Sequence, residues 1–235
     1  VKEPVRIYEV MTAGKKYPAV TKELPQKSPV KCIAVLPFLN LSNDPSLEYF
    51  SDGLTEELIS HLSRLKDMRV ISRTTSMKYK GTKKGIKTIG METGASYIME
   101  GSVRIHGNNL RITAQFVDAN RDIHLWAESY NGTLDDVFDI QEKVSAKIVS
   151  EFRLQLTKDE KDSLQKRYTE NTEAFQLYLQ GRYFWNKRNE EGLNTAIRYF
   201  EKAIETDPDY ALAWAGLADT YNLLGEFTNR SRREL

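Results

Sequence analysis

The spacing of apolar and polar positions changes along the first two thirds of the chain, and the changes predict strands and helices. Residues 32–36 form a continuous, partly β-branched apolar run that ends at Pro37. Such a run predicts a short strand buried on both faces. Leucines then recur at positions 54, 58, 62 and 65, which is a helical spacing, and Ser51 or Asp52 is available to cap that helix.

A second strand and a second helix follow, separated by a basic stretch. Residues 68–72 predict a second short strand, and residues 86–93 predict a helix that ends at Gly94. Residues 73–87 contain no acid and six basic side chains, so we expect a solvated loop. These side chains are Arg73, Lys78, Lys80, Lys83, Lys84 and Lys87.

Three segments of alternating apolar and polar residues come next and predict antiparallel strands joined by turns. The segments are 97–105, 110–116 and 123–127, with turns at 106–109 and 118–122. The alternating residues of the third strand are Ile123, Leu125 and Ala127.

The capping box Thr133-Leu-Asp-Asp136 opens a further predicted helix. One side of that helix carries Leu134, Val137, Val144, Ile148 and Phe152. The predicted order is therefore β-α-β-α-β-β-β-α. Strands separated by helices favour parallel pairing and strands on short turns favour antiparallel pairing. The fold class is α/β, with a mixed β-sheet flanked by helices over residues 31–156.

After Thr157 the pattern is helical and contains an internal repeat. One set of positions has the second-helix spacing of a tetratricopeptide repeat: Ala196, Phe200, Ala203 and Pro208. The next set has the first-helix spacing: Trp214, Leu217, Ala218 and Tyr221. We expect residues 157–235 to be a truncated helical-hairpin array, with more repeats following in the native chain.

The amino-terminal residues have a different texture. Residues 1–10 alternate loosely, and residues 11–30 contain three prolines and several lysines, which predicts a linker. The chain lacks an initiator Met and ends at Leu235 without a structural stop, so we expect a fragment of a longer protein.

Composition excludes several classes of function. Apolar residues make up 40% and charged residues 29%, as in soluble globular proteins. The net charge of +1 gives no argument for nucleic acid or an acidic membrane. The single cysteine, Cys32, excludes a disulfide scaffold and fits the cytoplasm. The sequence contains no membrane-spanning run and no signal peptide.

Four stretches together resemble the TolB amino-terminal-like domain. They are Ile33-Ala-Val-Leu-Pro-Phe-Leu-Asn-Leu-Ser42, Tyr49-Phe-Ser-Asp-Gly-Leu-Thr-Glu-Glu-Leu58, Glu100-Gly-Ser-Val-Arg104 and His124-Leu-Trp-Ala-Glu128. In bacterial multidomain proteins this domain often precedes tetratricopeptide repeats. The resemblance implies an α/β domain that mediates protein contacts and has no known catalytic centre.

The first ten residues, Val1-Lys-Glu-Pro-Val-Arg-Ile-Tyr-Glu-Val10, resemble the closing strand of a class III adenylate/guanylate cyclase domain. The resemblance implies a parent protein that makes cyclic nucleotides in signal transduction. Its cyclase domain would use Mg²⁺ or Mn²⁺, and its metal-binding aspartates would lie upstream of Val1. None of those residues maps onto this sequence, so we expect no cofactor in this chain.

Residues with metal-binding or nucleophilic chemistry have ordinary structural interpretations. The acidic cluster is Asp44, Glu48, Asp52, Glu56 and Glu57. We interpret Asp52 as a helix cap and the two glutamates after it as first-turn acids, which the helix dipole favours. The three histidines lack zinc-ligand spacing. A buried structural thiol is the commoner state for Cys32, and a Cys/His nucleophile pair stays open.

Two groups of residues are candidates for partner binding. Arg73, Lys78, Lys80, Lys83 and Lys84 could contact an acidic surface, although a solvated loop is the commoner structure. Tyr183 and Trp185 are equally compatible with repeat packing and with a peptide-binding groove. Trp126 is interpreted as a core residue.

The sequence therefore favours a non-catalytic regulatory region, carboxy-terminal to a nucleotide cyclase domain. It would bind a protein partner through the repeats and the α/β domain, without nucleic acid or membrane, and a homodimer is compatible with it. The alternative is an interaction scaffold of a transcription regulator or protein kinase with the same modules. A third alternative is that the α/β domain is itself an enzyme.

Overall fold

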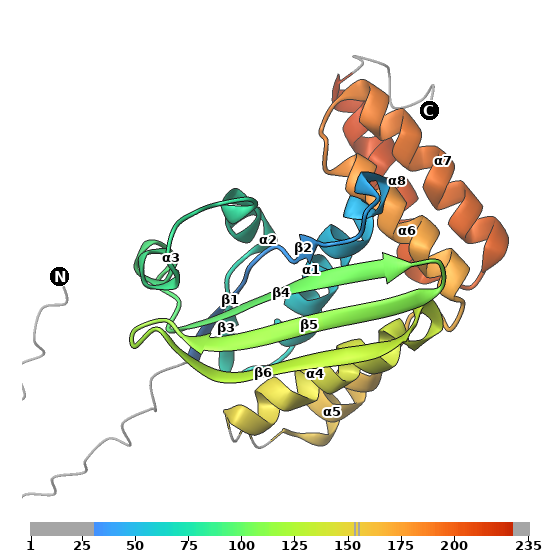
Figure 1. The fold of residues 1–235 in the computed structure, drawn as a ribbon. Coiled ribbons are helices and arrows are strands. Elements are labelled where there is room, and N and C mark those ends of the chain that lie inside the picture. The colour runs from blue at the N-terminus through green and yellow to red at the C-terminus, as the bar shows by residue number, and fades with distance from the viewer. Residues whose placement is uncertain (1–30, 153, 155, 228–235) are drawn as a thin grey trace, which may run out of the picture.

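The computed structural model describes residues 31–152, 154 and 156–227. The expected cyclase-like strand at 1–10 and the linker at 11–30 lie outside the described residues. The described residues form a six-stranded mixed sheet followed by helices (Figure 1). The strands are β1 (Lys31–Val35), β2 (Leu39–Asn40), β3 (Met68–Val70), β4 (Tyr97–His106), β5 (Asn109–Asp118) and β6 (Ile123–Thr133).

Strand pairing follows the connections, as the sequence predicts. The order is β3-β1-β4-β5-β6, and β2 also pairs with β4. β1 is parallel to both β3 and β4, because a helical connection separates these strands in the sequence. β4, β5 and β6 are antiparallel neighbours joined by short turns. The predicted α/β fold class, a mixed β-sheet with flanking helices and then an all-helical region, is confirmed.

The helices begin and end largely where the pattern predicts. They are α1 (Glu48–Leu62), α2 (Arg73–Ser76), α3 (Ile86–Thr93), α4 (Val137–Glu151), α5 (Lys158–Gln165), α6 (Thr172–Trp185), α7 (Glu190–Thr206) and α8 (Ala211–Phe227). Gly94 ends α3 in the left-handed conformation, with φ of 69°. The capping box between Thr133 and Asp136 is present and opens a 3₁₀ turn that continues as α4.

Two local predictions are wrong. α1 begins at Glu48, so Ser51 and Asp52 lie buried inside the helix and neither caps it. Asp44 supplies the cap instead: its carboxylate accepts from the Ser46 N–H, at the start of a 3₁₀ turn that leads into α1. The expected loop at residues 73–87 also begins as a helix, α2, because Ser72 caps it.

Strand β1 lies between two hydrophobic cores, as its continuous apolar run predicts. Ile33 and Val35 belong to the larger core, which α1 and α4 cover. Cys32 and Ala34 belong to a smaller core on the other face, together with Ile89 of α3. The expected buried thiol is confirmed.

In the third long strand, β6, the face that packs on the core is not the one formed by the alternating residues Ile123, Leu125 and Ala127. A register shift occurs where Phe116 pairs with Trp126 and Val117 pairs with His124, so Leu125 is an extra residue. The Trp126 side chain is buried in the larger core, as predicted, whereas Ile123 and Leu125 are exposed.

The larger core continues into the helical region without a break. Leu179 of α6 packs onto Gly53 of α1, where an added Cβ would lie only 2.7 Å from the leucine Cδ2. Further along, the buried Phe200 ring of α7 lies between Gly181 of α6 and Gly216 of α8, and a Cβ on either glycine would lie 2.6 Å from the ring. These contacts hold α6, α7 and α8 together and fix them against the sheet domain. The tetratricopeptide assignment stays a prediction.

Candidate functional site

The acidic side chains of α1 are partners for basic side chains from distant parts of the chain. The Lys80 Nζ lies 2.6 Å from Asp52 Oδ1 and 2.7 Å from Glu48 Oε1. Burial raises the pKa of the Asp52 carboxyl, and the Lys80 ammonium opposes that rise. Glu48 and Asp52 therefore share one ammonium group, and Asp52 does not cap the helix.

Glu56 is the most connected of these acids. Its Oε2 lies 2.8 Å from Arg73 Nε, and its Oε1 accepts from Arg182 Nε at 2.9 Å. Asn186 Nδ2 approaches the same carboxylate at 3.5 Å. Arg73 comes from α2 and Arg182 from α6, so one carboxylate joins the sheet domain to the helical region.

The predicted basic candidates therefore fall into two groups. Arg73 and Lys80 are ion-paired to α1, and Lys84 Nζ lies 2.6 Å from Glu92 Oε1. Lys78 and Lys83 are exposed and form no ion pair with any described residue. Binding of an acidic partner by this stretch stays a prediction; of its basic side chains, Lys78, Lys83 and Lys87 form no ion pair with a described residue.

The predicted aromatic candidates are both half-buried and lie two positions apart in the last turn of α6. Two guanidinium groups lie over the Trp185 ring, that of Arg182 at 4.4 Å and that of Arg188 at 3.7 Å from the ring centre. Tyr183 packs edge-on against Phe184, with ring centres 5.4 Å apart. Both side chains thus have packing partners, and a role for them in binding stays a prediction.

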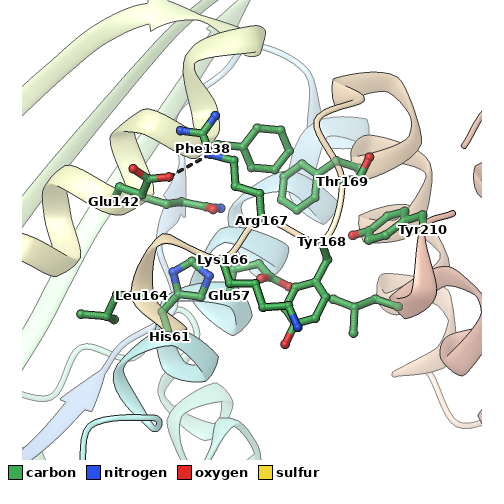
Figure 2. A pocket seen from close by; sticks show the side chains of 13 residues that line it. Glu57, His61, Phe138, Glu142, Leu164, Lys166, Arg167, Tyr168, Thr169 and Tyr210 are labelled. Carbon is green, nitrogen blue, oxygen red and sulfur yellow. Dashed lines mark hydrogen bonds and ion pairs between the residues drawn. The ribbon is translucent and has the colours of Figure 1, made fainter. Parts of the chain in front are cut away.

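A small polar cavity lies where α1, α4, the segment before α6 and the start of α8 meet (Figure 2). Its volume is about 20 Å³, which suits a single water molecule and no larger ligand. The ionisable or polar side chains in its wall include Glu57, His61, Gln141, Arg167 and Tyr210. They come from segments far apart in the sequence, and for that reason the spacing of residues gives no sign of the cavity.

Burial drives the two ionisable groups of α1 in this wall toward their neutral forms. Burial, with a smaller effect of Glu56, raises the pKa of the Glu57 carboxyl from 4.5 to about 7. Burial, with the nearby Arg64, lowers the pKa of His61 from 6.5 to about 4. The His61 Nδ1 and the Gln141 Nε2 are buried and have no hydrogen-bond partner among the described residues. A bound water would satisfy them.

Arg167 closes the same junction from outside. Its Nε lies 2.8 Å from Glu142 Oε1 and its second amino group lies 2.5 Å from Asp139 Oδ1, both on α4. The guanidinium also lies over the Phe138 ring, 5.6 Å from its centre. This arrangement is structural: it ties the segment before α6 to α4.

Within residues 31–152, 154 and 156–227 no group of three or more His, Cys, Asp or Glu side chains converges as metal ligands would. None of the helices described there is long and apolar enough to cross a bilayer.

The fold and its contacts define a class: a mixed α/β domain onto which a helical-hairpin region is packed. A family model described as "HilA/YgeH-like transcriptional regulator, second domain" matches residues 29–150, about half of the chain. The chain belongs to this family.

A curated relative links the chain to cyclases. The Rhizobium meliloti (strain 1021) protein named "Putative adenylate cyclase 3" is 37% identical over 221 residues, which is 93% of this chain. The match covers 38% of that protein, so this chain spans well under half of its relative. The expected kinship with a region of a cyclase-like protein is therefore confirmed.

Solved structures resemble the sheet domain at low identity. TolB from Acinetobacter baumannii is 19% identical, with a TM-score of 0.38, covering 53% of this chain and 29% of that one. The LpoB C-terminal domain from Salmonella enterica is 16% identical, with a TM-score of 0.36, covering 44% and 83%. The fold class rests on the strands and helices described above.

Proposed function

We propose that this chain is a protein-binding regulatory module that controls a nucleotide cyclase domain in the same polypeptide. One observation carries the proposal: the 37% identity with a protein named as an adenylate cyclase, over 93% of this chain.

Packing provides a physical route for regulation. The helical region shares its core with the sheet domain through Leu179 and Gly53, and shares a carboxylate through Glu56. A protein bound to the helices would thus act on the sheet domain as one body. It changes cyclase output only if it binds the active and inactive arrangements with different affinities.

Removal of the module from the full-length parent tests the proposal. We expect cyclic nucleotide production, or the oligomeric state, to change when residues 31–235 are deleted. A finer test uses the substitution Leu179→Ala, which weakens the packing of α6 on α1. The control is Leu193→Ala on α7, because Leu193 is equally buried but lies outside the larger core. Deletion that leaves both output and assembly unchanged would reject regulation.

A second candidate function is favoured by the family match. The HilA/YgeH description is that of a transcriptional regulator, so the module could instead be the interaction scaffold of a DNA-binding protein. The two functions separate in one pair of assays on the native full-length protein. Cyclic nucleotide formation from ATP or GTP supports the first, and DNA binding without turnover supports the second.

A further inference from the structure

Strand β6 is an unusually open edge of the sheet. It runs from Ile123 to Thr133, pairs with β5 on one side and has no strand on the other among the described residues (Figure 1). The opposite edge, β3, has three residues, whereas β6 has eleven. Natural edge strands are usually blocked by lysine, proline or a bulge. β6 has neither lysine nor proline, and its bulge at Leu125 lies near one end.

The free backbone groups of this edge can be assigned from one hydrogen bond. The Leu134 N–H donates to the Asn108 carbonyl, so the backbone of that position points toward β5. Hydrogen bonding alternates along an antiparallel pair, which places the N–H and C=O groups of Ala127, Ser129 and Asn131 outward. Thr133 fits this alternation, because its N–H donates to Asp136 Oδ2 instead of to β5. The three outward residues are all exposed.

We propose that β6 pairs antiparallel with β6 of a second copy of this chain, about a two-fold axis at Ser129. In that register Ser129 faces Ser129 of the second copy, and Ala127 faces Asn131. Each of these pairs exchanges both backbone hydrogen bonds, so the outward groups of one edge satisfy those of the other. The result is one continuous sheet across two chains.

The side chains agree with this register. Glu128, which pairs with Lys147 at 2.5 Å, would face Tyr130 of the second copy and not another carboxylate. Trp126 would face Gly132, so no charged side chain stands opposite another at that position. No position places like charges opposite each other. This self-complementarity selects a second copy over an unrelated strand.

The contact is small compared with a standard interface of about 1,600 Å², so we expect weak association of the isolated chain. Attachment to a domain that itself dimerises would raise the effective concentration and strengthen the pairing. The inference stands on the edge of β6 and does not rest on the proposed function.

Cysteine cross-linking tests both the pairing and its register. Facing residues of a hydrogen-bonded pair have Cα atoms about 5.5 Å apart, within reach of a disulfide. We expect Ser129→Cys to form a disulfide dimer, and a mixture of Ala127→Cys and Asn131→Cys chains to form a mixed dimer. Neither member of the mixture should cross-link alone, because its Cα would lie about 14 Å from its own equivalent. The native Cys32 is buried and does not compete.

Sedimentation over a concentration series provides an independent measurement on the 235-residue chain. Ser129→Pro removes an outward N–H that the chain's own sheet does not use, so it should keep the fold and abolish dimerisation. Ser129→Ala is the matched control and should still dimerise, and circular dichroism checks that each variant is folded. Should folding of the proline variant fail, Ser129→Lys tests the same edge by placing two like charges together. The proposal is overturned if the chain stays monomeric throughout, or if Ala127→Cys alone cross-links as fast as the mixture.

Discussion

The pKa of Glu57 is raised and that of His61 is lowered, so the two groups have opposite effects on how the free energy of unfolding depends on pH. A substitution of Glu57 leaves only the effect of His61. Between pH 4.5 and about 7, the folded protein holds a proton on Glu57 that the unfolded chain has lost. Folding therefore takes up a proton there, and the free energy of unfolding falls as the pH rises. His61 acts in the other direction between pH 6.5 and about 4, because its folded form is neutral while its unfolded form is charged. In the native chain the two contributions oppose each other.

Glu57→Gln removes only the first contribution. Each proton taken up on folding changes the free energy of unfolding by about 1.4 kcal/mol per pH unit. Relative to the native chain, the variant should therefore gain about 2 kcal/mol of stability between pH 5 and pH 7. The groups that surround the carboxylate are Glu56, Arg64 and Arg182, and the variant retains all three.

Urea unfolding followed by circular dichroism at pH 5, 6 and 7 measures this difference. The control is Glu201→Gln, which removes the same charge from an exposed position on α7. A Glu57→Gln stability difference that is flat with pH, or that matches the control, would refute the burial of an ionisable carboxyl at this junction.

Three further substitutions test the packing, each by urea unfolding. Gly181→Ala should cost about 1–3 kcal/mol, because its Cβ would overlap the buried Phe200 ring; an effect near zero would contradict the close approach. Glu56→Gln should cost about 2 kcal/mol, since two guanidinium groups lose the negative charge of their shared carboxylate, and no change would show that water replaces it. Trp126→Ala should cost about 3–5 kcal/mol. Trp126→Phe should cost much less, because the indole N–H has no partner among the described residues; similar costs would reveal a bond to that N–H.

Local patterns predicted the parts of the fold that local interactions determine. The alternation over residues 97–116 gave the central hairpin, since side chains of period two can bury one face only. The box at Thr133 and the glycine at 94 fixed helix ends through their own backbone geometry.

The missed features depend on contacts between distant segments. Asp52 has a side chain that can cap a helix, but Asp44 and Pro45 begin the helical turn earlier in the chain. Asp52 therefore lies inside α1, where it forms an ion pair with Lys80. The junction at His61 has no local signal, because its walls come from α1, α4 and α8. The candidate basic residues could be listed from the sequence, whereas the positions of α1 and α3 decide which of them are ion-paired.

Arg73 and Arg182 share the Glu56 carboxylate, so their contributions to stability depend on each other. Each guanidinium lies against a different oxygen, and the two arginines come from α2 and α6. Removal of one arginine leaves the carboxylate oriented by the other, so the two single losses should not sum to the double loss. The same coupling bears on regulation: an acidic partner that drew Arg73 away would leave Glu56 to Arg182 alone. Binding at the α2 edge of the sheet domain would in this way change how firmly α6 is held, without any contact between the partner and the helical region.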